Sequence, residues 1–158
     1  MSNRKVAEAN QRDTVPLGRI AARLAKHVEK ALGPGDLSLP QYRVLALLAH
    51  GSAVASALAS KLAVSPPSVT AIVDGLVARG LVQRQTDGGD RRRVTHVLTD
   101  KGRRVLSEAD TEATARLEAI AGHLAPRERE RAIEGLRLWP EAMDSYVSAS
   151  LEETRGTT

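Results

Sequence analysis

The chain has 158 residues, of which 42% are apolar, enough for one compact core or one small module with helical extensions. It has no cysteine, which excludes disulfides, thiolate metal sites and thiol-based redox switches. The net charge is +4, and the excess lies in residues 51–104, which carry nine basic and four acidic side chains, so a polyanion is expected to dock there.

The first predicted helix covers residues 17–32, where apolar residues recur at helical spacing with basic residues between them. A Gly-Pro-Gly sequence ends it. A second helix is predicted from about residue 39 to residue 51. Ser38 is placed to cap this helix, and Gln41 is placed to reach back to the capping residue.

Two short helices are predicted next, over residues 56–63 and 66–79. Ser65 is a good N-cap for the second of them, and Pro66 falls at the first helical position, where its missing N–H costs nothing. Two short helices joined tightly, the second with small polar residues at its start, are typical of a helix-turn-helix. β-Branched residues on both sides of the turn-rich segment 87–93 predict a basic hairpin, which forms a wing after a recognition helix.

Two longer helices are predicted after Thr99, a capping residue, and they are separated at Ala125-Pro126. Pro140 predicts a kink or an early break in the last one, and the tail is expected to fray from about Ser150. These helices and the first one are long and thinly apolar, so we expect them to interdigitate with a second copy. The domain prediction is a dimerisation region at 15–33 and 103–148, a winged helix-turn-helix at 37–102, and flexible termini at 1–14 and 149–158.

The segment LASKLAVSPPSVTAIVDGLVARGLVQRQTDGGDRRRVTHVLTDKG resembles the signature region of the MarR (multiple antibiotic resistance regulator) family. Its Asp90-Arg91-Arg92 triplet is followed by Leu98-Thr99 and then Gly102, as in the family's wing. The resemblance spans about residues 15–147. It implies a mainly α fold with a small β-hairpin wing, in which a winged helix-turn-helix is flanked by N- and C-terminal dimerisation helices. It also implies a homodimeric repressor on a pseudo-palindromic operator, released by a small-molecule effector.

The sequence departs from the family pattern at two places that matter for DNA. Val54 occupies the usual cap position of the first helix-turn-helix helix, where relatives have Thr or Ser. The recognition helix has few long polar side chains, which predicts sparse base reading, strong salt dependence and a large share of shape readout.

Four residues near the start of the recognition helix are candidates for contact with base edges: Pro67, Ser68, Thr70 and Ala71. The two hydroxyls are donors and acceptors, and the Thr70 methyl group can contact a thymine methyl. Backbone N–H groups at this helix end are also expected to hold a phosphate. The alternative is that the two hydroxyl side chains only cap and solvate the helix.

The wing carries the candidates Asp90, Arg91, Arg92 and Arg93. A guanidinium in a narrow minor groove gains from the negative potential there. By resemblance, Arg92 is the inserted residue and Asp90 orients it through an ion pair; the alternative is a solvated charge run. Predicted phosphate contacts, each of which is alternatively a plain surface charge, are Lys61, Arg79, Arg84, Arg103 and Arg104.

By resemblance, a ligand pocket lies at the junction of the DNA lobe and the dimer helices, with the candidates His27, Tyr42, Arg43 and His50. No histidine spacing suits a metal, no cofactor is expected, and no nucleophile motif indicates an enzyme. No apolar run approaches the roughly 20 residues that cross a bilayer, and the N-terminus lacks a signal-peptide pattern, so a cytoplasmic protein without membrane contact is expected. The hypothesis is a DNA-binding transcription regulator; the alternative is a winged-helix module that binds an acidic protein.

Overall fold

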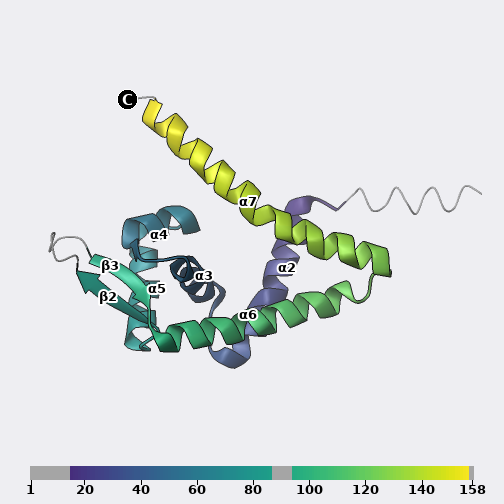
Figure 1. Cartoon of the computed structure of the whole chain (residues 1–158), viewed down its shortest axis with the longest axis horizontal. Coiled ribbons are helices and arrows are strands. Elements are labelled where there is room, and N and C mark those ends of the chain that lie inside the picture. Colours follow the sequence, from purple (N-terminus) through teal and green to yellow (C-terminus); the bar gives the residue numbers. More distant parts are fainter. Residues whose placement is uncertain (1–14, 87–93, 157–158) are drawn as a thin grey trace, which may run out of the picture.

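The computed structural model describes residues 15–86 and 94–156. In this part of the chain the elements are α2 (Leu17–Leu32), η2 (Gly33–Gly35), α3 (Leu39–Ala49), β1 (Ala53–Val54), α4 (Ala55–Leu62), α5 (Pro66–Ala78), β2 (Val82–Thr86), β3 (Val94–Leu98), α6 (Asp100–Ala121) and α7 (Pro126–Gly156). Figure 1 shows α3, α4, α5 and the hairpin gathered toward one end of α6, while α2 crosses α6 near its middle and α7 follows from its other end. The mainly helical fold with a small β-hairpin is confirmed.

The local signals of the sequence act as expected at the starts of the helices. The Ser38 side chain accepts a hydrogen bond from the Gln41 backbone N–H at 3.3 Å, and the Gln41 side chain accepts one from the Ser38 backbone N–H at 3.1 Å. Ser65 caps α5, and Pro66 is its first residue. Val54 precedes α4 with no side-chain cap. The predicted capping box is therefore confirmed, as is the helix-turn-helix pair.

The wing belongs to a three-stranded antiparallel sheet of order β1-β3-β2, in which Arg84 pairs with His96 and Ala53 also pairs with His96. Strand β1 was not predicted, because two residues are too short to show an alternating pattern. The ring of His96 is buried, and its Nδ1 lies 3.2 Å from the carbonyl oxygen of Ala53. This histidine therefore helps to hold β1 against the hairpin.

The core lies in the lobe formed by α3, α4, α5 and the sheet, and it reaches along α6. Because the chain has no Phe, aliphatic side chains fill it, and the largest fully buried ones are Leu32, Leu45, Leu48, Leu58, Leu76, Leu81, Val44, Val69, Val73 and Val82. One buried methyl-rich cluster thus fixes the orientation of α5 relative to α3, α4 and the hairpin.

Helix α7 runs from Pro126 through Pro140 to Gly156. The expectation of an early break at Pro140 is therefore wrong, and helical structure reaches past Ser150. The proline removes one helical hydrogen bond, but its side chain is exposed, so water can satisfy the carbonyl group that loses its donor. An exposed proline is tolerated here where a buried one would end the helix.

Candidate nucleic-acid interface

Helix α5 has one apolar face in the core and one face open to solvent. Val69, Val73 and Leu76 are buried. The four predicted base-reading residues are all exposed: Pro67, Ser68, Thr70 and Ala71. The fold therefore presents them together, on a short surface with two hydroxyls and two apolar side chains.

Both hydroxyl side chains make local hydrogen bonds. The Ser68 and Ser65 Oγ atoms are 2.7 Å apart, and Thr70 Oγ1 donates to the carbonyl oxygen of Pro66 at 3.1 Å. A hydroxyl that donates one hydrogen bond keeps two lone pairs for a further partner. Since both residues are exposed, these bonds orient the hydroxyls without covering them.

The first turn of α5 is poor in free amide donors. Pro66 and Pro67 have no N–H, and the backbone N–H of Ser68 is directed at Ser65 Oγ, 3.4 Å away. The next N–H, of Val69, donates to the carbonyl oxygen of Ser65. An anion site at a helix N-terminus needs unbonded N–H groups. The expected phosphate site made by backbone groups of this turn is therefore wrong, and any anion contact here falls to side chains.

Arg84 lies on β2, next to α5, and its guanidinium forms an ion pair with Asp74 on the open face of α5. Both side chains are about half exposed, at 50% and 52%, so the pair contributes little to stability. It does hold the cation beside the recognition helix, where a phosphate can reach it. Asp74 was not predicted as its partner, because an exposed acidic residue carries no local signal for a partner on another element.

Arg79, at the C-terminal end of α5, points inward. Its Nη1 donates to the carbonyl oxygen of Asp36 at 2.7 Å and lies 3.5 Å from Gln41 Oε1. Lys101 Nζ in turn donates to the carbonyl oxygen of Arg79 at 2.9 Å. Among the predicted phosphate contacts, Arg79 thus differs from Arg84 because its guanidinium donates to a backbone carbonyl group and not to a carboxylate.

The other predicted phosphate contacts lie on the surface. Lys61 is exposed near the end of α4, and Arg103 and Arg104 are exposed in the first turns of α6. Arg103 Nε is 4.0 Å from Asp100, at the distance limit of an ion pair. The four wing candidates, Asp90, Arg91, Arg92 and Arg93, lie outside the described residues.

The four candidate pocket residues bind their own chain or face solvent. Tyr42 donates its hydroxyl to Asp110 at 2.6 Å, joining α3 to α6, and Arg43 donates to the carbonyl oxygen of Leu62 at 3.2 Å. Burial raises the pKa of the Tyr42 hydroxyl, and the hydrogen bond to Asp110 and its charge act in the same direction. His27 Nδ1 is 3.4 Å from an Arg116 nitrogen, and His50 is exposed at the end of α3.

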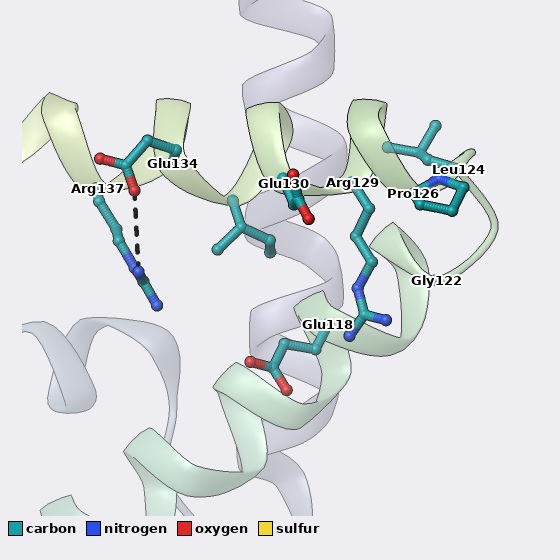
Figure 2. Close-up of a pocket in the computed structure, with 9 residues that line it drawn as sticks. Glu118, Gly122, Leu124, Pro126, Arg129, Glu130, Glu134 and Arg137 are labelled. Carbon is teal, nitrogen blue, oxygen red and sulfur yellow. Dashed lines mark ion pairs between the residues drawn. The ribbon is translucent and has the colours of Figure 1, made fainter.

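Two hollows lie on α2, α6 and α7, the helices that lead away from the lobe of α3, α4, α5 and the sheet. None of those four candidate residues lines either hollow. One hollow, of about 680 Å³, is at the corner between α6 and α7 and has charged walls. Figure 2 shows Arg129 pointing from α7 toward α6, and the ion pair between Glu134 and Arg137, which are 3.8 Å apart. The other, of about 840 Å³, is an apolar groove between α2, α6 and α7. Tyr42 and Asp110 thus join two helices away from both hollows.

Within residues 15–86 and 94–156, no helix is both long and apolar enough to span a bilayer. In the same part of the chain, no group of His, Asp and Glu side chains is placed to hold a metal ion. The open face of α5, the cation beside it and the three-stranded sheet are instead the parts of a winged helix-turn-helix surface.

Comparison with known proteins decides the family. The family model described as MarR family matches residues 35–93. The HTH-type transcriptional regulator YfiV of Bacillus subtilis (strain 168) is 31% identical over 111 residues, which cover 70% of this chain and 69% of that protein. The chain belongs to the MarR family. This MarR-family protein is a DNA-binding transcription regulator, and members of the family are not enzymes.

Two further relatives extend the comparison. The HTH-type transcriptional repressor Rv2887 of Mycobacterium tuberculosis is 31% identical over 124 residues, 75% of this MarR-family chain and 89% of that protein. The transcriptional repressor CouR bound to a 23-mer DNA duplex matches with a TM-score of 0.65 and 28% identity, over 79% of this chain and 89% of that one. CouR of Rhodococcus jostii RHA1 bound to p-coumaroyl-CoA matches with a TM-score of 0.66 and 26% identity, over 83% and 88%. The hypothesis of a DNA-binding transcription regulator is confirmed.

Proposed function

We propose that this regulator is a repressor that binds a pseudo-palindromic operator as a homodimer and is released by a small-molecule effector. Two α5 helices enter successive major grooves, with Pro67, Ser68, Thr70 and Ala71 toward the bases. The wing arginines Arg91, Arg92 and Arg93 contact the DNA, with Arg92 inserted into the flanking minor groove and oriented by Asp90. The observation that carries the proposal is the open face of α5, because its residues are exposed together while the opposite face of the helix is fixed in the core.

Base reading by this face is short-range and partly apolar. Ser68 and Thr70 offer hydroxyls, and the methyl group of Thr70 and the side chain of Ala71 suit thymine methyl groups. Affinity comes mainly from cations around the face, namely Lys61, Arg84, Arg103 and Arg104, which contact phosphates. Few base contacts and many phosphate contacts make the affinity steeply salt-dependent and leave a large share of specificity to the shape of the duplex.

The apolar groove between α2, α6 and α7 supports the homodimer. Its walls include Leu17, Ile20 and Trp139, whose exposed fractions in the single chain are 76%, 40% and 58%. Exposed apolar area of this kind on three helices is typical of an interface, and a second copy of α2 and α7 supplies the matching apolar surface. In this proposal, residues 15–33 and 103–148 serve dimerisation and residues 37–102 bind DNA.

Effector release rests on the likeness to CouR and on the junction between the DNA lobe and α6. At this junction the Tyr42 hydroxyl binds Asp110, and farther along α6 His27 of α2 lies beside Arg116. A ligand that replaces these contacts changes the angle between α3 and α6 and so the separation of the two α5 helices. In this proposal Tyr42, Arg43, His27 and His50 border the effector site.

The test measures dimerisation and DNA binding together. Trp139→Glu places a charge in the apolar groove, and we expect a monomer by sedimentation equilibrium at micromolar concentration, with loss of the gel shift on the chain's own promoter region. Ser145→Glu is the matched control, because it also replaces a neutral side chain by a carboxylate, at an exposed position of α7 that lines neither hollow. A wild-type monomer, or a Trp139→Glu variant that binds DNA as the control does, would refute the homodimer.

A further inference from the structure

Arg79 is the one predicted phosphate contact whose guanidinium donates to backbone of a distant element. Its Nη1 donates to the Asp36 carbonyl oxygen at 2.7 Å, 43 positions back in the chain, and lies within 3.5 Å of Gln41 Oε1. A guanidinium offers several donors in a fixed plane, so it can hold two acceptors from different elements at once. Here the two acceptors lie on either side of the start of α3.

The same end of α5 is held from the other side by the start of α6. Lys101 Nζ donates to the carbonyl oxygen of Arg79 at 2.9 Å, and Thr99 Oγ1 donates to that of Gly80 at 2.7 Å. Both bonds satisfy carbonyl groups at the helix C-terminus, which has no intrahelical donors for them. The C-terminal end of the recognition helix is thus fixed by hydrogen bonds on two sides, since Arg79 donates toward the start of α3 and the start of α6 donates to this end of the helix. The reading face of the helix lies at its other end.

The acceptor Asp36 connects this end of α5 to the proposed dimerisation region. Asp36 directly follows η2, which continues α2, and its backbone is in the left-handed region with a φ of 54°. Helix α2 packs along α6. A contact between Arg79 and Asp36 therefore sets the angle of α5 relative to α2 and not only to its own lobe.

We propose that Arg79 is a positioning residue, which fixes the recognition helix to the turn between α2 and α3 and so determines discrimination between operator and other duplexes. The inference rests on the proposed function, in which α5 reads the operator. A cation that contacts phosphate supplies affinity for every duplex and contributes to the salt dependence. A cation that orients α5 supplies affinity only where the base contacts require that orientation.

The two roles predict different results for the same substitution. The probes are the duplex most enriched from a random pool by the wild-type protein and a duplex of equal length and composition in scrambled order. For Arg79→Gln we expect at least a tenfold loss of affinity for the enriched duplex, less than a twofold loss for the scrambled one, and an unchanged salt slope on the scrambled duplex. For the control Arg104→Gln we expect losses on both duplexes and a slope smaller by about one.

Arg79→Lys separates charge from geometry. Lysine keeps the charge but not the planar set of donors, so a positioning role predicts that this variant resembles Arg79→Gln, while a phosphate contact predicts near wild-type binding to both duplexes. Hydrogen exchange of the free protein gives a second measurement, and it needs no DNA. The amides of residues 75–81 should exchange faster in both Arg79 variants and at the wild-type rate in Arg104→Gln.

Each outcome decides the inference. Equal losses on the two duplexes, with a reduced salt slope, would make Arg79 a phosphate contact and overturn it. Unchanged exchange of residues 75–81 would overturn it even if Arg79→Gln were too unstable for binding assays, because Arg79→Lys can be measured in its place. If the wild type showed no preference for the enriched duplex, the proposed operator binding would fail first, and this inference would fail with it.

Discussion

Gly102 is the position where the fold leaves the least room for a side chain. A methyl group on Gly102 would lie 2.0 Å from the carbonyl oxygen of Leu81 and 3.3 Å from the side chain of Leu98. The Leu81 carbonyl oxygen already accepts from the backbone N–H of Thr99 at 3.1 Å and from its Oγ1 at 3.2 Å. Gly102→Ala therefore has to move the start of α6 away from the backbone that follows α5.

The cost can be worked out from these contacts. Overpacking against rigid backbone costs about 1–3 kcal/mol, and weakening the two bonds from Thr99 costs about 1 kcal/mol more. The better helix propensity of alanine stabilises α6 by about 1 kcal/mol and offsets part of this cost. We expect Gly102→Ala to lower the free energy of unfolding by about 2 kcal/mol, within the range for steric mutations in a core.

The assay is urea denaturation followed by circular dichroism, at a fixed protomer concentration because the proposed dimer would make the stability depend on concentration. Gly75→Ala is the matched control, since it adds the same methyl group inside α5 with nothing closer than Gln41 Nε2 at 3.8 Å. It should raise the free energy of unfolding by about 0.5–1 kcal/mol. A Gly102→Ala variant as stable as Gly75→Ala would show that α6 does not approach Leu81 this closely.

Three further predictions concern stability and its dependence on pH. Tyr42→Phe should lower the free energy of unfolding by about 1 kcal/mol at pH 7, because the hydrogen bond to Asp110 is lost. Since the pKa of Tyr42 is raised in the folded state, this difference in stability from the wild type should hold below about pH 10 and shrink above it. Urea titration at pH 8 and pH 11 measures it. A constant difference at both pH values would contradict the assigned bond. Ser65→Ala should lower the free energy of unfolding by about 1 kcal/mol, because α5 loses its N-cap. The control Ser56→Ala, at an exposed position in α4, should leave it unchanged. Leu58→Ala should cost about 2–5 kcal/mol, because Leu58 is fully buried, and a cost below 1 kcal/mol would contradict its place in the core.

The sequence predicts what depends on local chemistry. Capping residues and the proline at the start of α5 sufficed to predict the helix-turn-helix. The β-branched residues on both sides of the turn-rich segment after Gly80 sufficed to predict the hairpin. The partners of Arg79 and Tyr42 could not be predicted, because they lie 43 and 68 positions away and contribute only a backbone carbonyl group and an exposed carboxylate. Neither partner has a local pattern that would single it out.

In the candidate interface, too, some features follow from the sequence and others only from the structure. That Ser68 and Thr70 would be exposed followed from the apolar stripe on the opposite side of α5. Two missing amide donors in the first turn of α5 also follow from the sequence, since Pro66 and Pro67 have no N–H. The third donor, the backbone N–H of Ser68, is occupied by Ser65, whose Oγ faces both the backbone and the side chain of Ser68. A side chain that serves two partners at once is visible only in three dimensions.

The most direct measurement of the central claim is selection of bound duplexes from a random DNA pool by the full chain. Two α5 helices held by a symmetric dimer should enrich an inverted repeat whose half-sites are centred about one helical turn, roughly 34 Å, apart. Substitution of Ser68 and Thr70 by alanine should weaken the preference at the same positions in both half-sites. Enrichment of a single half-site, direct repeats, or a site unchanged by these substitutions would contradict the account.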